Sequence, residues 1–376
     1  MNKIKLLHIQ LLPILSGVQN VMIQLLLGLE PEKYDIYVLS SSNGPLAKKV
    51  VENGWTHIPL DCFVRKLSIK DIKVFFVLYK IIKEIKPDIV HTHSSKPGFI
   101  GRIVSKMCKV PMIVHTIHGF PFHNYQNIFI RFFLTTLDSI AALFADYNVF
   151  VNKFEKEIAI LRLGYNMKKA VTIYNGINLY EKTKNYPIDM EKQPLNIVSV
   201  LRFTKQKNVI FTIERVVSIV KENDDVFFTF YGDGELLKRC MEIVQANNLQ
   251  DRIVFKGWLN EIQDELLYYD VFLLNSLWEG LSLAILEAMS VGLPIICSNI
   301  KGNNELVDVN NGWLIDPKNK DDLSKTIQEI LSDKNILPIK GHESLKKVTL
   351  QFQYELFISE YKKIYEKIFE KKLNEV

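Results

Sequence analysis

The chain has 376 residues, more than one ordinary hydrophobic core can organise, so we expect two domains of nearly equal size. Hydrophobic residues make up 48% of the sequence and charged residues 24%, without a low-complexity tract, which excludes a disordered or fibrous protein. Residues 1–190 carry 24 Lys and Arg against 14 Asp and Glu, and this basic half suits a phosphate-bearing acceptor, an anionic membrane surface or a set of solvated helix faces.

The N-terminal residues 1–10 run straight into a strand pattern and show none of the regions of a signal peptide. The four cysteines are scattered and form no CxxC pair, which indicates reduced thiols and argues against a disulfide framework or a cysteine zinc site. The longest apolar run, residues 128–145, is interrupted by Arg131 and Asp138, so we predict a buried helix and not a membrane span. These features predict a cytoplasmic protein.

Short β-type runs alternate with helical patterns, which is typical of parallel sheets covered by helices on both faces. The strands expected in the first half are residues 4–10, 35–40, 88–93, 112–118, 147–151 and 170–174. The helical patterns between them are residues 18–29, 68–85, 98–109, 127–145 and 153–163.

The alternation stops over residues 182–194, a polar stretch with two prolines that we interpret as a linker. Strands are then expected at residues 196–201, 226–231, 252–256, 271–274 and 294–297. A last amphipathic helix, within residues 352–376, could pack back across the domain junction. The sequence therefore predicts an α/β chain of two Rossmann-like, doubly wound domains, residues 1–181 and 195–351, that face a central cleft.

Ligands of open α/β sheets bind beyond the carboxyl ends of the strands, so residues that follow strands are the candidates for a site. Ser16 and Gly17 close the loop after the first strand, where a helix begins and its N–H groups can hold an anion. Because this loop has a single glycine, an ordinary turn between strand and helix is the simpler interpretation.

Four histidines lie near the ends of two expected strands: His91, His93, His115 and His118. Such a group could suggest a metal site, but no carboxylate or cysteine stands nearby at ligand spacing, so we predict no metal. His118 is followed by Gly119 where the chain leaves the sheet. There it could donate to a sugar hydroxyl or to developing charge, or it could be a structural turn residue.

Two cations follow the strand at residues 196–201, namely Arg202 and Lys207, directly before a helical pattern. Fixed positive charges beside a helix N-terminus form a cradle for a diphosphate. Gly232 and Gly234 follow the next strand and permit a close approach of the backbone to a ligand, although a plain turn is equally open.

The most specific element follows the strand at residues 271–274 and runs from Trp278 to Glu287. Glu279 precedes a helix at whose start Gly280 and Leu281 would present free N–H groups. Glu287 lies eight residues beyond Glu279, roughly 12 Å along a helix, which suits an extended ligand with the sugar at one end and the ribose at the other. The paired-carboxylate hydrolases need a separation of at most about 9.5 Å across one bond and fit this spacing poorly.

Together these motifs resemble the retaining glycosyltransferases of family 4, which have the GT-B fold, and the resemblance covers nearly the whole chain. Glu279 and Glu287 match the E-x7-E motif of that family, and Arg202 and Lys207 match its Arg-x4-Lys pair. Three further segments resemble family motifs in the family's order: the His118–Gly119 loop, the Asn-Gly turn at residues 175–178 and the loop at residues 302–312.

The resemblance implies a division of labour among these residues. Arg202 and Lys207 would stabilise the departing diphosphate in place of a divalent metal, and Glu279 would orient the sugar. Glu287 would hold the ribose. His118 would contact the donor sugar near the reacting centre.

The resemblance further implies that the first domain binds the acceptor and the second the nucleotide-sugar. Backbone groups at residues 256–258, Gly257 among them, would read the base. The N–H groups of residues 280–282 and the Gly232 turn would contact the donor. Ser16–Gly17, on the acceptor side, stands where many relatives have two glycines.

Residues 91–98 and 115–123 resemble the bacterial capsule and O-antigen transferases, which extend a polyprenyl-diphosphate-linked glycan at the cytoplasmic face of the membrane. That likeness implies a UDP-sugar donor, with an N-acetylhexosamine as a frequent sugar, and neither a cofactor nor nucleic acid as a partner. The lysine-rich stretch at residues 65–86 could lie on an anionic membrane, or it could be a helix that covers the first sheet.

Two other functions stay open from the residues. A nucleotide-sugar epimerase on the same scaffold would release a changed nucleotide-sugar without an acceptor, and the E-x7-E motif argues against it. A non-catalytic subunit would bind the nucleotide-sugar without turnover, and the four intact charged residues of the two motifs argue against that.

Overall fold

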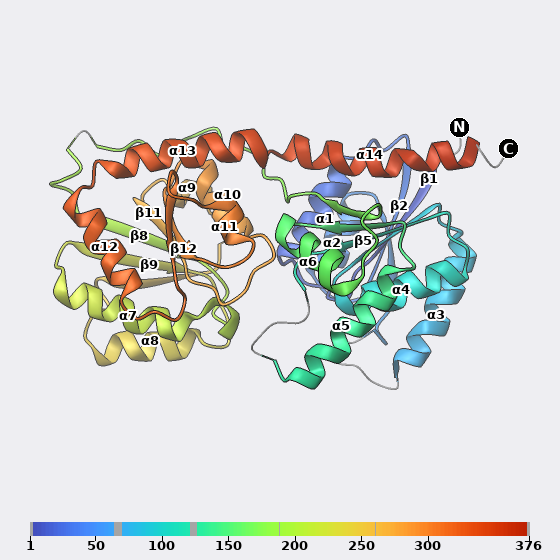
Figure 1. Ribbon diagram of the computed structural model, residues 1–376, viewed down its shortest axis with the longest axis horizontal. Coiled ribbons are helices and arrows are strands. Elements are labelled where there is room, and N and C mark those ends of the chain that lie inside the picture. The colour runs from blue at the N-terminus through green and yellow to red at the C-terminus, as the bar shows by residue number, and fades with distance from the viewer. Residues whose placement is uncertain (1–2, 64–69, 121–125, 188, 260, 374–376) are drawn as a thin grey trace. The chain divides into compact units, whose positions relative to one another are not determined.

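The structure is a computed structural model that describes residues 3–63, 70–120, 126–187, 189–259 and 261–373. The chain divides into two compact units: residues 1–176 with 355–376, and residues 177–354. Each unit contains one parallel sheet with helices on both faces (Figure 1). Among the described residues, no helix combines the length and the apolar character needed to cross a bilayer.

The sheet of the first unit has seven parallel strands in the order β3-β2-β1-β4-β5-β6-β7. These strands are β1 Ile4–Ile9, β2 Tyr34–Ser40, β3 Thr56–Pro59, β4 Ile89–His93, β5 Met112–Ile117, β6 Tyr147–Phe150 and β7 Ala170–Thr172. The helices are α1 Gly17–Leu27, α2 Pro45–Glu52, α3 Lys70–Ile85, α4 Ser95–Met107, α5 Ile128–Ala142, α6 Lys153–Leu163 and α14 Tyr354–Leu373. Every residue of β4 and β5 is buried, as expected for central strands covered on both faces.

The sheet of the second unit has six parallel strands in the order β10-β9-β8-β11-β12-β13. These strands are β8 Leu195–Val200, β9 Val226–Tyr231, β10 Ile253–Gly257, β11 Val271–Leu274, β12 Ile295–Ser298 and β13 Gly312–Ile315. The helices are α7 Val209–Glu222, α8 Leu237–Ala246, α9 Gln263–Leu266, α10 Leu283–Ser290, α11 Asn303–Leu306, α12 Asp322–Ser332 and α13 Ile336–Gln351, with a short 3-10 helix at Lys205–Lys207. This architecture confirms the predicted α/β class with two Rossmann-like sheets.

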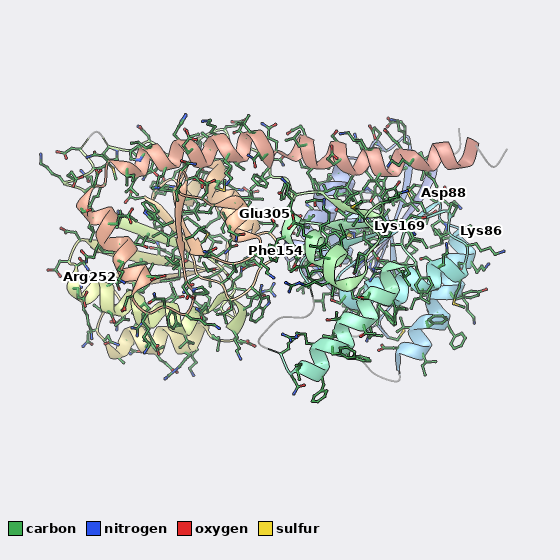
Figure 2. All side chains as sticks on the ribbon, viewed as in Figure 1. Lys86, Asp88, Phe154, Lys169, Arg252 and Glu305 are labelled. Atoms are coloured by element: carbon green, nitrogen blue, oxygen red, sulfur yellow. The ribbon has the colours of Figure 1, made fainter. Side chains whose placement is uncertain are left out.

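Acidic side chains accept backbone hydrogen bonds at the amino ends of two central strands. Asp88, labelled in Figure 2, stands directly before β4 and accepts a hydrogen bond of 2.9 Å from the N–H of Lys5 in β1. Asp270 does the same before β11, where it accepts from the N–H of Asn196 in β8 at 2.9 Å. At the amino edge of each sheet, backbone N–H groups are thus hydrogen-bonded to side chains of the protein itself. The loops at the carboxyl edge are the ones that can bind a ligand.

The C-terminal helix α14 returns to the first unit and packs on its sheet (Figure 1). A side chain at Gly28, the residue after α1, would collide with Ile358 at 2.5 Å, so glycine there permits the close approach of α14. Lys362 of α14 also pairs with Glu30 at 2.8 Å. The described part of the stretch expected as a linker, residues 182–187 and 189–194, has no helix or strand. The Tyr186 hydroxyl in this stretch donates to the Asp270 and Gly292 carbonyls.

The prediction that the apolar run at residues 128–145 is a buried helix is wrong. The run forms helix α5, but the helix is not buried, since Phe129 is 79% exposed and Phe132 72% exposed. The buried face is fixed by Asp138, which pairs with Arg102 of α4 at 2.8 Å and accepts from the Tyr165 hydroxyl at 2.6 Å. A buried carboxylate needs such partners, and their position turns the apolar face of α5 outward.

Candidate active site

In each sheet the strand order reverses at one point, between β1 and β4 in the first unit and between β8 and β11 in the second. Loops that leave two neighbouring strands in opposite directions at such a point open a crevice at the carboxyl edge, where α/β proteins bind ligands. The loop after β8 carries Arg202 and Lys207, and the loop after β11 carries Glu279. The fold therefore puts both sequence motifs of the second unit at its switch point.

Lys207 and Glu279 are in direct contact. The Lys207 Nζ donates to Glu279 Oε1, and the side chains are only 16% and 10% exposed. The neighbouring Gln206 ties the two loops together, because its carbonyl accepts from Leu277 N at 2.8 Å and its amide donates to the Trp278 carbonyl at 2.9 Å. A cation and a carboxylate are thus held side by side at the carboxyl edge.

Arg202 lies on the same loop but points to solvent. Its side chain is exposed, whereas Leu201 and Phe203 on either side are buried. Within the described residues, its guanidinium makes no hydrogen bond or ion pair. It is therefore available to an anionic ligand without first breaking an ion pair, unlike Lys207.

Gly232 and Gly234 serve the protein's own backbone. Both have positive φ values, 134° and 154°, and a side chain would meet the Leu201 carbonyl oxygen at 1.8 Å and the Phe203 carbonyl oxygen at 2.6 Å. Glycine is required because the turn after β9 presses on the loop that carries Arg202. The Gly232 N–H donates to the Gly257 carbonyl at 2.7 Å, which joins this turn to the end of β10.

The segment between Glu279 and helix α10 is a second place, beside the loop of Arg202 and Lys207, where an anion could bind. Ser282 is the N-cap of α10, and its Oγ accepts from the N–H of Ile285 at 3.4 Å. Gly302 presses on the segment from outside, since a side chain there would lie 2.0 Å from the Gly280 carbonyl oxygen. The expectation that Gly280 and Leu281 present the first N–H groups of the helix is wrong, because the helix begins only at Leu283 after the N-cap Ser282. The first N–H groups of the helix point toward the loop that holds Glu279.

Glu287 lies on α10 in a mostly buried position, and its carboxylate has no partner among the described residues. Burial raises the pKa of this carboxyl to about 7. A mostly buried carboxyl without a partner among the described residues, on the same short helix, is suited to accept hydrogen bonds from ligand hydroxyls.

Ser16, Gly17 and His118 belong to the first unit, whereas the other predicted site residues belong to the second. Ser16 is the N-cap of α1, and its hydroxyl contacts the Gln19 side chain. His118 follows β5, and its Nε2 lies 3.1 Å from Nδ1 of His93. Burial lowers the pKa of His118 to about 4, so its imidazole is neutral at physiological pH.

Sequence reasoning missed His8, which joins His91 and His93 inside the first sheet. One ring nitrogen of each lies within 4.8 Å of the others, so the group could in principle hold a metal ion. However, every ring nitrogen of the three already has a hydrogen-bond partner. A metal would have to displace those partners, and no carboxylate or thiolate belongs to the group to offset its charge.

Two tyrosines of α14, Tyr361 and Tyr365, also reach this cluster. No sequence signal could have linked them to it, because they lie more than 240 positions along the chain from their partners Thr116 and His91.

Sequence profiles of two glycosyltransferase families match successive parts of the chain. The profile described as "Glycosyltransferase Family 4" matches residues 15–181, and the profile described as "Glycosyl transferases group 1" matches residues 182–347.

Two curated relatives are similar along most of their length. An Escherichia coli enzyme named UDP-Gal:alpha-D-GlcNAc-diphosphoundecaprenol alpha-1,3-galactosyltransferase is 35% identical, over 97% of this chain and 97% of its own. A Campylobacter jejuni enzyme named N,N'-diacetylbacillosaminyl-diphospho-undecaprenol alpha-1,3-N-acetylgalactosaminyltransferase is 25% identical, over 79% of this chain and 81% of its own. Among solved structures, Anabaena HepE in complex with UDP superimposes with a TM-score of 0.80 at 16% identity, over 97% of this chain and all of HepE.

Proposed function

The chain belongs to the group 1 glycosyltransferases of family 4, with the GT-B fold, and on that premise we propose that it moves a sugar from a UDP-sugar to a glycan carried on undecaprenyl diphosphate, with retention of the anomeric configuration. The process would be the assembly of a bacterial surface polysaccharide. The observation that carries the proposal is the contact of Lys207 with Glu279 at the switch point of the second sheet.

The donor side of the proposal rests on the second unit. Arg202 and Lys207 would neutralise the diphosphate as it departs, which is the task of a divalent cation in other glycosyltransferases, so we propose that transfer needs no metal. When the diphosphate engages Lys207, the Glu279 carboxylate loses that partner and can accept from hydroxyls of the sugar. Glu287 would hold the ribose, and the backbone of Gly257, Gly280, Leu281 and Ser282 would bind the rest of the nucleotide.

The choice of UDP and of a lipid-linked acceptor is supported by the relatives. The names of the two curated relatives specify diphosphoundecaprenol acceptors, and UDP is bound in the HepE structure. The donor sugars of those names make UDP-galactose and UDP-N-acetylgalactosamine the first candidates for this chain.

The step itself would be a front-face displacement. The site offers carboxylates that orient the sugar and cations that receive the leaving diphosphate, and we propose no covalent enzyme intermediate. The acceptor hydroxyl forms the new glycosidic bond on the face from which UDP leaves, and its proton passes to the departing diphosphate. His118, from the first unit, would donate a hydrogen bond to the donor sugar near the reacting carbon.

The acceptor side suggests a contact with the membrane. The first part of the lysine-rich stretch at residues 65–86, up to residue 69, lies outside the described residues. Residues 70–85 form helix α3, which exposes Lys73, Lys80 and Lys83. We propose that these lysines lie on an anionic bilayer together with the exposed apolar face of α5. The N-termini of both helices follow strands and therefore lie at the carboxyl edge of the first sheet, as His118 does.

The direct test is transfer from a panel of UDP-sugars to undecaprenyl-diphosphate-linked glycans, with EDTA present and absent. We expect Lys207→Ala and Glu279→Ala each to lower turnover about 100-fold or more while circular dichroism stays unchanged. The matched control is Lys205→Ala, an exposed lysine two positions from Lys207, which should retain full turnover.

Three outcomes would count against the proposal. Normal turnover by Lys207→Ala or Glu279→Ala would remove the assigned site. Release of a changed nucleotide-sugar without acceptor would indicate an epimerase, and donor binding without turnover on any acceptor would indicate a non-catalytic subunit.

A further inference from the structure

Seven side chains of the first unit form one continuous series of hydrogen bonds, which we call the histidine–tyrosine chain. In order, it runs through Tyr361, Thr116, His91, Tyr365, His8, His93 and His118. The successive distances between the bonded atoms are 2.8, 2.7, 2.5, 3.3, 2.9 and 3.1 Å. The chain therefore joins the C-terminal helix α14, through the buried strands β5, β4 and β1, to His118 at the carboxyl edge of the sheet.

Every member of the chain before His118 is at most 1% exposed, and burial decides how many protons each one carries. Desolvation lowers the pKa of His8 to about 3 and holds the pKa values of His91 and His93 well below the usual range, so the imidazoles are neutral. Burial also raises the pKa values of Tyr361 and Tyr365, so the phenols keep their protons.

A neutral imidazole has one N–H and one lone pair, and a hydroxyl donates one hydrogen bond, so each link can donate in only one of two directions. The links are coupled, because a nitrogen of a neutral imidazole that accepts forces its other nitrogen to donate. The hydroxyls of Thr116 and Tyr365 have hydrogen-bond partners only within the chain among the described residues, so each must donate to one neighbour and accept from the other to satisfy its proton. The whole chain must then donate either toward His118 or toward Tyr361.

Tyr361 selects the direction. Within the described residues its hydroxyl has Thr116 Oγ1 as its hydrogen-bond partner, at 2.8 Å. If the chain donated toward Tyr361, the proton of this buried phenol would have no acceptor, which costs free energy. If the chain donates toward His118, the Tyr361 proton is satisfied, and the one N–H left over belongs to Nδ1 of His118 at the edge of the sheet.

We propose that Tyr361, Thr116 and Tyr365 are positioning residues that hold His118 as the neutral Nδ1–H tautomer, so that its Nδ1–H is offered to an oxygen of the donor sugar. The inference rests on the proposed function for the role of His118, and on the first unit alone for the tautomer. Within the described residues, nothing hydrogen-bonds to His118 Nδ1, which leaves that N–H for a ligand. His118 then acts as a fixed hydrogen-bond donor.

The same geometry argues against a path that conducts protons to solvent. Tyr361 is 1% exposed, and the chain ends at its ring within the sheet–helix interface. A path that conducts protons would need water or another proton donor at Tyr361 to exchange protons with. Fixing the direction of donation needs only a buried hydroxyl at that position.

The test uses full-length protein labelled with 15N-histidine, in which the nitrogen shifts of each imidazole report its tautomer. In the unaltered protein at pH 7.5 we expect His118 as a single Nδ1–H tautomer. Tyr361→Phe combined with Thr116→Val removes both hydroxyls at the Tyr361 end whose protons need an acceptor within the chain, and Tyr365→Phe cuts the chain between His91 and His8. Both variants should give His118 as a mixture of tautomers.

Tyr165→Phe is the matched control, because it removes another buried tyrosine hydroxyl of the same unit, one bonded to Asp138 and outside the chain. It should leave His118 as a single tautomer. A cationic or Nε2–H His118 in the unaltered protein would overturn the proposal. So would a His118 that stays purely Nδ1–H both in Tyr361→Phe with Thr116→Val and in Tyr365→Phe.

Kinetics give the second readout. An evenly mixed tautomer population should lower kcat about twofold, and a mainly Nε2–H population should lower it further, with KM for the UDP-sugar nearly unchanged. A normal kcat in a variant whose tautomers are mixed would overturn the assigned use of the Nδ1–H. If the unaltered protein turns over no UDP-sugar, the proposed function fails. The 15N spectra would still show whether the histidine–tyrosine chain controls the tautomer of His118.

Discussion

Glu287 combines three properties that ordinary helix residues do not share: it is mostly buried, it has no partner among the described residues, and burial raises its pKa to about 7. A carboxyl with this pKa is about half protonated at neutral pH. Because a charged carboxylate accepts a hydroxyl hydrogen bond better than a neutral carboxyl, its charge should govern how tightly the ribose is held.

We therefore expect the affinity for a UDP-sugar to increase as pH rises through 7. Between pH 8 and pH 6 the charged fraction of a group with this pKa falls about tenfold, and Kd should rise by up to that factor. Isothermal titration calorimetry at pH 6, 7 and 8 measures this.

Glu287→Gln is the matched control, because it keeps the shape of the side chain and cannot ionise. It should bind more weakly than the unaltered protein and show a flat profile over the same range. An equally steep profile in Glu287→Gln would assign the dependence to another group.

At the residue scale, the sequence predicted what lies next to a strand end and missed what lies inside a strand. Lys207 and Glu279 were predicted as site residues because each follows a strand pattern in a motif of fixed spacing, and the structure puts them in contact. His8 sits within an apolar strand pattern, and Tyr361 lies on a distant amphipathic helix. Their relation exists only after the helix has packed on the sheet.

Among the elements, helix α5 departs most from its expected role. Phe129, Phe132, Phe133, Ile140 and Leu143 recur at helical spacing on its exposed face. Surface helices usually present polar residues to water, and an exposed apolar stripe of this size marks an interaction site. Hydropathy alone indicated burial because it reports how apolar a helix is, and not which face the neighbouring helices leave open.

The membrane contact is tested by replacing two residues of this stripe. Phe129→Ser with Phe132→Ser should weaken binding to vesicles that contain phosphatidylglycerol about tenfold or more, since burying one Phe side chain is worth about 1.5–3 kcal/mol. Vesicle flotation measures binding. KM for a long-chain polyprenyl acceptor in vesicles should rise, while KM for a short-chain soluble acceptor should not.

Leu161→Ser is the control for this pair, because Leu161 is 80% exposed on α6 of the same unit and stands apart from the stripe. It should bind vesicles like the unaltered protein. Equal binding by the double variant, or a change in its oligomeric state instead, would show that α5 contacts something other than lipid.

Elements were predicted well where their patterns are strong. The expected strands at residues 226–231 and 271–274 coincide with β9 and β11. Strand β3 was missed because it is a four-residue edge strand with no fully buried position, and β13 because it is short and begins with a glycine. Tertiary pairing, not local pattern, makes strands of such segments.

The whole first unit should be sensitive to acid. Its histidines His8, His91, His93, His115 and His118 all have pKa values lowered by burial, to about 3 for His8 and about 4 for His118. At pH 7.5 they are mostly neutral in both folded and unfolded chains, because the unfolded pKa is 6.5. Below pH 6.5 the unfolded chain takes up protons that the folded chain does not, so the free energy of unfolding falls.

Each such histidine should lower the free energy of unfolding by about 1.4 kcal/mol per pH unit between pH 6 and its folded pKa. We expect the urea midpoint followed by circular dichroism to drop steeply from pH 7.5 to pH 5. Equal midpoints at the two pH values would mean that the five imidazoles are accessible to protons in the folded protein.

For the molecule as a whole, the sequence predicted two Rossmann-like sheets because alternation of strands and helices recurs on both sides of the stretch at residues 182–194. The sequence also led us to expect that a last amphipathic helix packs back across the domain junction, but not which contacts would hold it. Residues 355–376 belong to the same unit as residues 1–176, a grouping that depends on contacts such as Lys362 with Glu30.

That grouping has a consequence for biosynthesis. The first unit cannot close until its last helix has left the ribosome, about 200 residues after its sheet has been translated, or roughly 10–40 s later at 5–20 residues per second. During this interval the rings of His8 and His91 lack the phenol of Tyr365. A nascent chain that stops short of α14 also leaves uncovered the apolar surface against which Phe357, Ile358 and Ile364 are buried, and exposed apolar surface of this kind is what chaperones bind.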